Sequence, residues 1–440
     1  MNDTIAAVST ALARSGVAVI RISGAEAATI AKRMFAKPLV PRKAVYGDLL
    51  SESGVLLDNI VALYFPAPNS YTGEEVVEFH CHGSPALVVV VLKAAFALGA
   101  RQALAGEFTK RAFLNGKLDL IQAEAVADLI DAETEQAAVN AASQLSGAIS
   151  KQITRVYDDL TGLMAHFYAA VDYPEEDIEP QNDILDVARN SIDALTKLEA
   201  TFEKGRIVKD GLSVVILGKP NVGKSSLLNA LVGFDRAIVT ATPGTTRDTI
   251  EDSTVINGLR LRLTDTAGIR ESSDAIERLG IERSEDSVAY ADVIVVALDA
   301  SAPLDAEDDA VIELAERSGK PVFTVLNKSD LPRVCLAEGI PVSAKTGDGI
   351  VEFGKALTSR FATADTAVQT ALLSNERQHS LVVNAISTLK LLLENLQTAG
   401  VSAETLSDAE FALNCLAEAI GRKVQDDIVE TIFSRFCVGK

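Results

Sequence analysis

The spacing of apolar side chains divides the chain into a mixed region, two helical regions and a strand-rich region between them. In the first 118 residues, short apolar runs such as Val17–Ile22 and Val76–His82 alternate with helical stretches, which predicts an α+β domain. From about residue 119 apolar residues recur at steps of three and four: Leu145, Ile149, Ile153, Val156, Leu160, Leu163, Phe167 and Val171. This spacing predicts one face of a long helix, which the proline-bearing segment Tyr173–Pro180 ends.

Helical periodicity returns near the end of the chain, at Leu381, Ile386, Leu389, Leu393 and Leu396 and again at Leu416, Ile420, Val424, Ile428 and Ile432. The simplest packing joins both helical portions into one domain, with the strand-rich region inserted in it. The expected boundaries are 1–118, 119–211, 212–362 and 363–440.

The stretch Leu212–Leu228, LSVVILGKPNVGKSSLL, predicts a buried strand, a glycine-rich turn and the start of a helix. Gly218, Gly223, Lys224 and Ser225 fit the pattern G-x-x-x-x-G-K-[ST] of a phosphate-binding loop. Backbone N–H groups of such a loop surround a polyphosphate, the lysine reaches the β and γ phosphates to serve catalysis, and the serine hydroxyl binds Mg²⁺. The expected nucleotide contacts here are Asn221, Val222, Gly223, Lys224, Ser225 and Ser226.

Three later elements, each at a strand end, indicate a guanine nucleotide and a Ras-like GTPase. The first is DTAG, formed by Asp265, Thr266, Ala267 and Gly268, after the strand Leu259–Leu263. The second is NKSD, with Asn327, Lys328 and Asp330, and the third is SAK, formed by Ser343, Ala344 and Lys345. The carboxylate of Asp330 can accept two hydrogen bonds from guanine, whereas adenine would leave this buried acceptor unpaired.

The hydrolytic residues differ from the Ras pattern, because Ile269 occupies the position of the water-orienting glutamine. The stretch TATPGTTRD supplies Thr246 as a second Mg²⁺ ligand, and Thr240 and Thr245 as further GTP contacts. Oxygens from Asn221, Thr240, Thr242 and Thr245 form a candidate K⁺ site in place of an arginine finger. Asn221 equally suits a loop residue that hydrogen-bonds its own turn.

Composition is that of a large protein of the reducing cytoplasm. The chain has 440 residues, 48% hydrophobic residues and four cysteines without paired spacing. Its longest apolar run, Ala86–Leu92, is too short to span a membrane. A net charge of −20 predicts weak binding of tRNA by this chain alone. The basic pairs Lys110–Arg111 and Arg422–Lys423 are either RNA contacts or solvated charges.

In the strand VVEFHCH, alternation places Val77, Phe79 and Cys81 on one face and Glu78, His80 and His82 on the other. The polar face can line a pocket. A metal site of His80, Cys81 and His82 is disfavoured, because Cys81 points away from both histidines.

The motifs GKPNVGKSSLLN, PGTTRD, DTAGIRE, ERLGIERS, NKSD and SAK resemble those of the MnmE (TrmE) family of tRNA-modification GTPases. Similarity extends to SYTGEEVVEFHCHG, to GEFTKRAFLNGKLDLIQAEAVADLI and to the terminal FSRFCVGK. Ribosome-assembly GTPases of the Era type share the G-domain motifs but carry an RNA-binding domain after them. The resemblance implies a multidomain α/β plus all-α fold, with an α+β folate-binding and dimerisation domain and a helical domain containing an inserted Ras-like GTPase domain.

The resemblance also implies the partners and chemistry. They are a homodimer, tRNA, and a GidA (MnmG)-type protein that carries FAD, which together install a carboxymethylaminomethyl-type group on the wobble uridine. A 5-formyltetrahydrofolate-type ligand would be bound by Arg21, Glu78, Lys117 and Lys440. Glu277 would orient the hydrolytic water.

Two questions stay open from the sequence. Cys437 is either a nucleophile beside Arg435 and Lys440 or a buried cysteine packed against Phe433 and Phe436. The alternative function is a GTP-timed RNA-binding or ribosome-assembly factor without modification chemistry.

Overall fold

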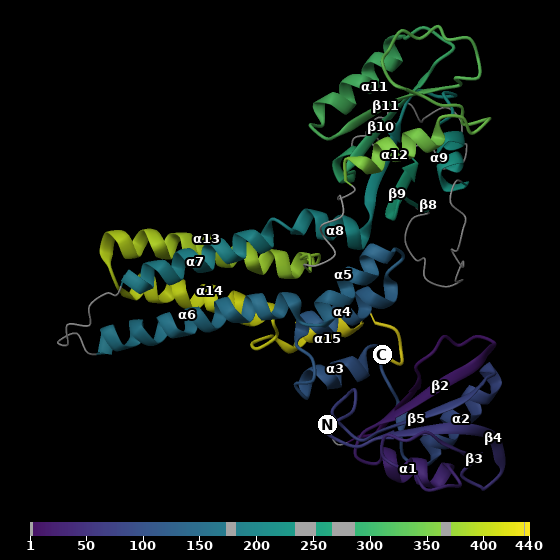
Figure 1. Cartoon of the computed structure of the whole chain (residues 1–440), viewed down its shortest axis with the longest axis vertical. Helices are drawn as coiled ribbons and strands as arrows, with labels where there is room; N and C mark the ends of the chain where they lie inside the picture. Colours follow the sequence, from purple (N-terminus) through teal and green to yellow (C-terminus); the bar gives the residue numbers. More distant parts are fainter. Residues whose placement is uncertain (1–2, 173–181, 234–251, 266–286, 362–370, 435) are drawn as a thin grey trace. The chain divides into compact units, whose positions relative to one another are not determined.

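The chain folds into two compact units (Figure 1). The computed structural model describes residues 3–172, 182–233, 252–265, 287–361, 371–434 and 436–440. One unit contains residues 1–130, 142–199 and 376–440, and the other contains residues 131–141 and 200–375. No helix within these described ranges is long and apolar enough to cross a membrane.

A six-stranded sheet in the order β3-β4-β5-β2-β1-β6 forms the N-terminal part of the first unit. Its strands are β1 (Ile5–Val8), β2 (Ser15–Ser23), β3 (Val45–Leu50), β4 (Leu56–Phe65), β5 (Val76–Gly83) and β6 (Arg101–Gln102). All neighbours are antiparallel except β1 and β6. In β5 the predicted alternation is confirmed: Val77, Phe79 and Cys81 are buried, while Glu78, His80 and His82 are partly or fully exposed.

Helices cover both faces of this sheet. On one face, α1 (Ala27–Met34) and α2 (Pro85–Ala97) share a core with alternate residues of the strands. On the other face, Ile5 and Ala7 pack against Phe108 of α3 (Glu107–Leu114). Because side chains alternate along β1, the same short strand contributes to both cores.

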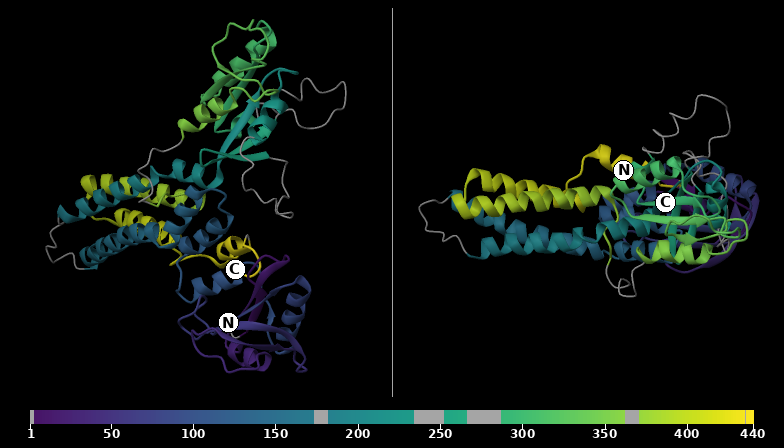
Figure 2. Two further views of the ribbon diagram at one scale, coloured as in Figure 1. Left: turned by 45° about the vertical axis from the view of Figure 1, so that its right-hand side comes forward. Right: turned by 90° about the horizontal axis from the view of Figure 1, so that it is seen from above.

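Four long helices form the helical part of the first unit: α6 (Ala148–Asp172), α7 (Asn182–Glu199), α13 (Glu376–Ala399) and α14 (Ala403–Ala419). Each packs against two of the others, so segments before and after the second unit lie side by side (Figure 2). The prediction of one helical domain with an insertion is therefore confirmed. The shorter α15 (Asp426–Ser434) packs on α3, and Val429 and Phe433 share a small core with Leu120 at the start of α4 (Leu120–Asp131).

The long helix predicted from Leu145 onward is wrong at its first turn. Leu145 ends the preceding helix α5 (Glu135–Leu145), and α6 begins at Ala148. Gly147 between them has φ 83°, a left-handed conformation that a continuous helix does not contain. The buried stripe from Ile149 to Phe167 is confirmed. The predicted break at 173–180 lies outside the described residues.

The second unit contains a mostly parallel sheet in the order β12-β11-β10-β7-β9-β8. Its strands are β7 (Leu212–Leu217), β8 (Asp252–Ile256), β9 (Leu259–Asp265), β10 (Val293–Asp299), β11 (Val322–Asn327) and β12 (Ile340–Pro341). Among these strands of the described residues, only β8 is antiparallel to its neighbour.

The sheet lies between two layers of helices, and β7 and β10 bury side chains on both of its faces. One core includes α9 (Lys224–Gly233) and α12 (Ile350–Ser359), and the other includes α11 (Ala306–Arg317). The short helix α8 (Phe202–Asp210) leads into β7. The carboxyl ends of β7, β10 and β11 meet at one edge, where a Ras-like fold binds its ligand.

Candidate functional site

The phosphate loop connects the end of β7 to α9, as the sequence predicts. Gly223 has φ 94°, and a Cβ there would lie 2.4 Å from Nδ2 of Asn327, so only glycine fits. The Nζ of Lys224 donates to the carbonyls of Gly218 (2.6 Å) and Lys219 (3.0 Å). Lys224 and Ser225 begin α9, whose N-terminal N–H groups favour an anion.

Asn327 links the phosphate loop to the loop of the SAK motif. It is 2% exposed, donates to the carbonyl of Val222 (2.7 Å) and accepts from the N–H of Ala344 (3.0 Å). The structure therefore brings Asn327 of the NKSD motif to the phosphate loop, 105 residues away in the chain.

The predicted guanine reader Asp330 is exposed at the same edge. Its Oδ1 accepts from the Ser343 hydroxyl at 2.7 Å, and this bond fixes the carboxylate against the SAK loop. Lys328 has φ 64° and donates to Oδ2 of Asp299 at 2.6 Å. Burial alone would raise the pKa of Asp299, but hydrogen bonds from Lys328 and Ser301 outweigh it and hold this pKa below its usual range.

Several predicted nucleotide and cation residues lie outside the described residues: Thr240, Thr242, Thr245, Thr246, Thr266, Ala267, Gly268 and Glu277. Asp265 ends β9, where its backbone pairs with Ile216 of β7. Ser226 is exposed on the first turn of α9, and Lys345 is exposed after Ala344.

A second group of predicted residues meets in the first unit. Arg21 of β2 lies directly opposite Glu78 of β5, so both side chains point to the same face. Their Nε and Oε1 atoms are 2.8 Å apart. The Arg21 guanidinium also lies over the rings of Tyr71 (5.1 Å) and Phe108 (5.5 Å).

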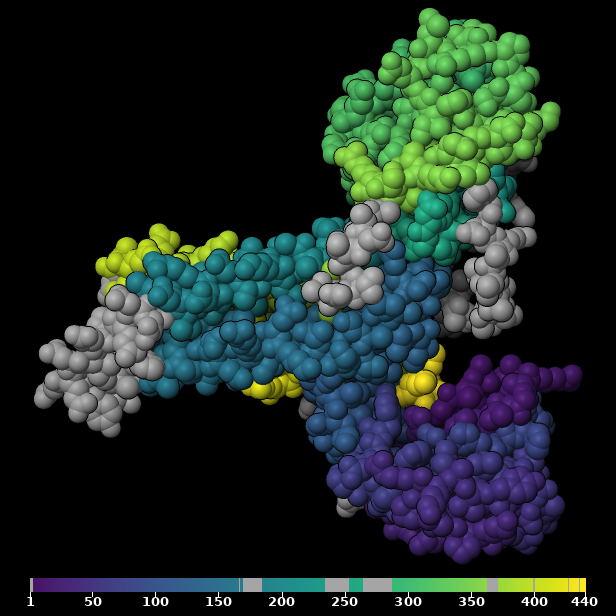
Figure 3. Space-filling model, viewed as in Figure 1, coloured from purple at the N-terminus to yellow at the C-terminus, as the bar shows by residue number. Residues whose placement is uncertain are grey.

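The C-terminal segment, yellow in Figure 3, lies against the purple N-terminal part of the first unit. Val438 forms a bridge with Ala105, and the N–H of Phe108 donates to the Lys440 carbonyl at 3.1 Å. A Cβ on Gly439 would lie 2.0 Å from the carbonyl oxygen of Val8, so the glycine of the C-x-G-K tail is required by this approach.

Lys440 lies close enough to Arg21 and Glu78 to interact with both charges. Burial, and then the positive charge of Arg21, lower the pKa of Lys440, although Glu78 and Cys437 act in the opposite direction. Three of the four predicted folate residues therefore come together. Lys117 is exposed after α3, beside Gly73, and none of the contacts in the described part of the chain joins it to the other three.

The buried alternative for Cys437 is wrong, because this cysteine is exposed. Phe433 and Phe436, its expected neighbours in a core, are buried and pack on each other with ring centroids 5.4 Å apart. Cys437 follows the last turn of the chain, where the backbone leaves this small core to meet Gly106.

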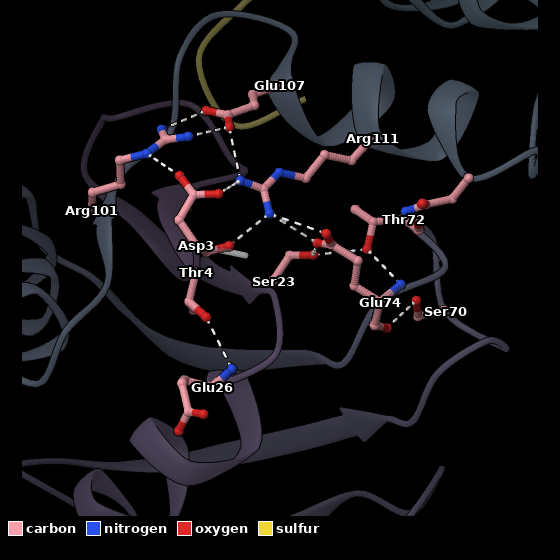
Figure 4. A network of polar contacts seen from close by, with 11 residues as sticks. Asp3, Thr4, Ser23, Glu26, Ser70, Thr72, Glu74, Arg101, Glu107 and Arg111 are labelled. Carbon is pink, nitrogen blue, oxygen red and sulfur yellow. Dashed lines mark hydrogen bonds and ion pairs between the residues drawn. The ribbon is translucent and has the colours of Figure 1, made fainter. Parts of the chain in front are cut away.

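An ion network around the buried side chain of Arg111 holds the elements that carry this group (Figure 4). Arg111 of α3 is 1% exposed and donates to Asp3 (2.8 Å), Glu107 (3.0 Å) and both carboxylate oxygens of Glu74 (3.1 Å). Arg101 donates to Glu107 and Asp3 from the other side.

The predicted solvated or RNA-binding role of Arg111 is therefore wrong. Arg111 faces inward on α3, whereas the neighbouring Lys110 lies 3.6 Å from Glu430. Burial would raise the pKa of Glu107, but its bonds from Arg101, Leu104 and Arg111 lower it overall. The stability that Glu107 contributes is therefore present at neutral pH and lost as the pH falls through its lowered native pKa.

Sequence reasoning missed Tyr71, Phe108 and Thr109. Phe108 and Thr109 lie on α3, and the Thr109 hydroxyl is 2.8 Å from the Tyr71 hydroxyl. This hydrogen bond joins the side chain of Tyr71 to α3, the helix that carries Phe108. Burial raises the pKa of the Tyr71 hydroxyl. A chemical signal was present, since aromatic residues flank motif charges in SYTGE and GEFTKR, but only their contact with Arg21 gives them a role.

Known proteins resemble this chain over its whole length. The family model described as GTP-binding protein TrmE N-terminus matches residues 4–117, and the MnmE helical domain model matches residues 120–437. The tRNA modification GTPase MnmE of Koribacter versatilis is 40% identical over 455 residues, which cover 100% of both chains. That of Chromobacterium violaceum is 42% identical over 447 residues, covering 99% of this chain and 98% of the relative.

Replacing Arg111 by Met is expected to destabilise the first unit by about 3–5 kcal/mol, because Asp3, Glu74 and Glu107 lose their buried counter-charge. Chemical denaturation, monitored by hydrogen exchange of the backbone amides in residues 3–118, measures the change in the free energy of unfolding. The control is Arg189→Met, since Arg189 is 50% exposed in its pair with Asp186 and its loss should cost about 0–1 kcal/mol. Equal losses in the two variants would contradict the assigned role of the network.

Lys440 is expected to titrate below the usual lysine range. Competitive acetylation of Lys440 over a range of pH values, measured by peptide mass spectrometry, gives the midpoint of the titration of its ammonium group. Arg21→Met should raise this midpoint and Glu78→Gln should lower it, because each removes a charge that acts on the ammonium. Arg33→Met, an exposed change on α1, serves as the control. A midpoint that does not move in Arg21→Met would show that Lys440 is not beside Arg21.

Proposed function

We propose, because this chain belongs to the MnmE (TrmE) family of tRNA modification GTPases, that its GTP hydrolysis drives a conformational step in modifying the wobble uridine of certain tRNAs. GTP hydrolysis in tRNA modification is its activity, and tRNA is its substrate. The finer proposal is a homodimer working in the cytoplasm with a GidA (MnmG)-type partner whose FAD serves the chemistry. The product would carry a carboxymethylaminomethyl-type group.

The observation that carries the nucleotide part of the proposal is the pair of bonds made by Asn327. By joining the Val222 carbonyl to the Ala344 N–H, this side chain sets the phosphate loop and the guanine loop at a fixed separation. Asp330 stands beside them with its carboxylate fixed by Ser343. A guanine base and its polyphosphate therefore have preformed acceptors, donors and a helix N-terminus.

Mg²⁺ would be bound by the hydroxyls of Ser225 and Thr246, together with the β and γ phosphates. Lys224 would supply a positive charge to the same phosphates. Its two carbonyl partners, Gly218 and Lys219, hold the ammonium within the loop. We assign water orientation to Glu277 by family resemblance.

K⁺ would bind to oxygens of Asn221, Thr240, Thr242 and Thr245. Asn221 supports this assignment because it is exposed in the loop with φ 64°, and its side chain makes no hydrogen bond to its own turn within the described residues. A cation there would supply the charge that an arginine finger supplies in other GTPases, and would assist G-domain dimerisation.

A 5-formyltetrahydrofolate-type ligand would bind Arg21, Glu78, Lys117 and Lys440. Glu78 can accept from pterin N–H groups, and the cations suit the glutamate carboxylates. Support comes from the meeting of Arg21, Glu78 and Lys440, where the Arg21 guanidinium lies over the rings of Tyr71 and Phe108. Cys437 on the same tail is the candidate nucleophile. The bound ligand should protect Lys440 from acetylation.

Asp330→Asn should weaken GTP binding and shift preference toward xanthosine triphosphate, because xanthine has an acceptor where guanine has a donor. Competition titration of the purified chain measures this. In cells that lack the natural gene, the variant should leave wobble uridines unmodified by mass spectrometry. An unchanged guanine preference would sink the nucleotide assignment, and normal modification in cells without the gene would sink the tRNA assignment.

Glu277→Ala should slow single-turnover GTP hydrolysis by about two orders of magnitude while GTP affinity stays normal, as expected for a preorganised catalytic group. Glu271→Ala is the matched control in the same acidic stretch. If both variants lose the same activity, or neither does, Glu277 does not orient the water.

Hydrolysis should be faster in K⁺ than in Na⁺ at equal ionic strength, since the candidate oxygens replace the hydration shell of the larger ion. Asn221→Ala should abolish this difference while GDP affinity changes little. Equal wild-type rates in the two salts would rule out the K⁺ site.

A further inference from the structure

The phosphate loop contains a second lysine, Lys219, whose side chain contacts α11. Its Nζ donates to Oδ2 of Asp305 and Oδ2 of Asp308, both at 2.6 Å. Only 15% of the Lys219 side chain and 3% of the Asp308 side chain are exposed. Hydrogen bonds from Lys219 to the two carboxylates raise its pKa, so the lysine stays charged throughout the working pH range.

The two carboxylates belong to a fixed structure at the start of α11. Asp305 is the N-cap residue and accepts from the N–H groups of Glu307 and Asp308. Asp308 in turn accepts from the N–H of Asp305, which completes a capping box. Because both acceptors are already held by backbone groups, they give Lys219 a rigid anchor.

The loop is therefore held at two points. Lys219 anchors its first half to α11, and the bond from Asn327 to the Val222 carbonyl anchors its second half to the end of β11. Between these anchors lie Pro220 and Asn221. The Lys219 carbonyl also accepts from Lys224, so the position of the Lys219 backbone affects the lysine that meets the phosphates.

We propose that Lys219 is a positioning residue of this GTPase, which holds the phosphate loop in its binding shape through the first turn of α11. Its ammonium is bound to the two carboxylates of α11, so Lys219 acts through the backbone of the loop. The loop backbone binds phosphates that GDP and GTP share, so loss of the anchor weakens both nucleotides alike. Once nucleotide is bound, its own contacts hold the loop, and the rate of the chemical step is kept.

The test uses the full chain with Lys219→Met and titrates GDP and a non-hydrolysable GTP analogue. Both affinities should fall by about tenfold, while kcat at saturating GTP stays within about twofold of the natural chain. Lys219→Arg should retain most of the affinity, since a guanidinium also reaches two carboxylates. Unchanged affinities in Lys219→Met, or equal losses in Lys219→Arg and Lys219→Met, would overturn the proposal.

Lys320→Met is the matched control. Lys320 is tied to three backbone carbonyls of the same unit, those of Val288, Ala289 and Ala291, and lies beyond the other end of α11. Its loss should lower the unfolding midpoint without changing either affinity. An equal loss of affinity in Lys320→Met would show that general destabilisation, and not the anchor, controls binding.

A double variant separates positioning from the burial of a charge. In Lys219→Met alone, Asp308 is left in the protein interior without its counter-charge. Adding Asp308→Asn removes that charge and keeps an acceptor for the capping box. The double variant should recover the unfolding midpoint but keep the weak nucleotide affinity. Recovery of both together would mean that Lys219 is only a counter-ion.

Discussion

The N-terminal part of the chain depends on the ion pairs that the buried guanidinium of Arg111 forms. A charge that is 1% exposed is tolerated only when several acceptors surround it, and here they come from separate segments. Asp3 precedes β1 and Glu74 precedes β5, whereas Glu107 lies one turn before Arg111 on α3. The guanidinium therefore gains all of its partners only when the first two segments have joined α3. Helix α3, fixed in this way, carries Phe108 to Arg21 and offers its N-terminal turn to the last residues of the chain.

The same physical rule applies in the second unit, with an amide in place of a charge. The buried side chain of Asn327 must satisfy both its donor and its acceptor, and the partners are backbone groups of two different nucleotide loops. Lys219 and the capping box of α11 restrain the phosphate loop from its other side. Rigid strands thus carry loops whose conformations are set by a few buried polar contacts.

The exit of the chain from the second unit is held by the same kind of contact. The side chain of Asn140 bonds both backbone groups of Leu372, at 3.3 Å to its carbonyl and 2.8 Å to its N–H. The N–H of Leu373 donates to Thr201 at 3.0 Å. A Cβ on Gly205 would meet the Leu373 carbonyl oxygen at 2.0 Å, so glycine is required where the entering and leaving segments cross.

The sequence by itself determined where the main helical and strand-rich regions lie, the insertion and the nucleotide motifs, because these follow from local periodicity and from short contiguous patterns. The positions of Gly223, Lys224 and Asp330 at strand ends could be read directly from the chain. It did not determine that Arg111 is buried, that α5 ends before Gly147 or that Cys437 is exposed, since each depends on contacts with distant segments. Two adjacent basic residues, such as Lys110 and Arg111, are expected on the surface from the sequence alone. Only the orientation of the helix shows that one of them is buried. Only the tertiary structure decided which polar groups share a buried partner, because desolvation depends on what surrounds a side chain and not on its neighbours in the sequence.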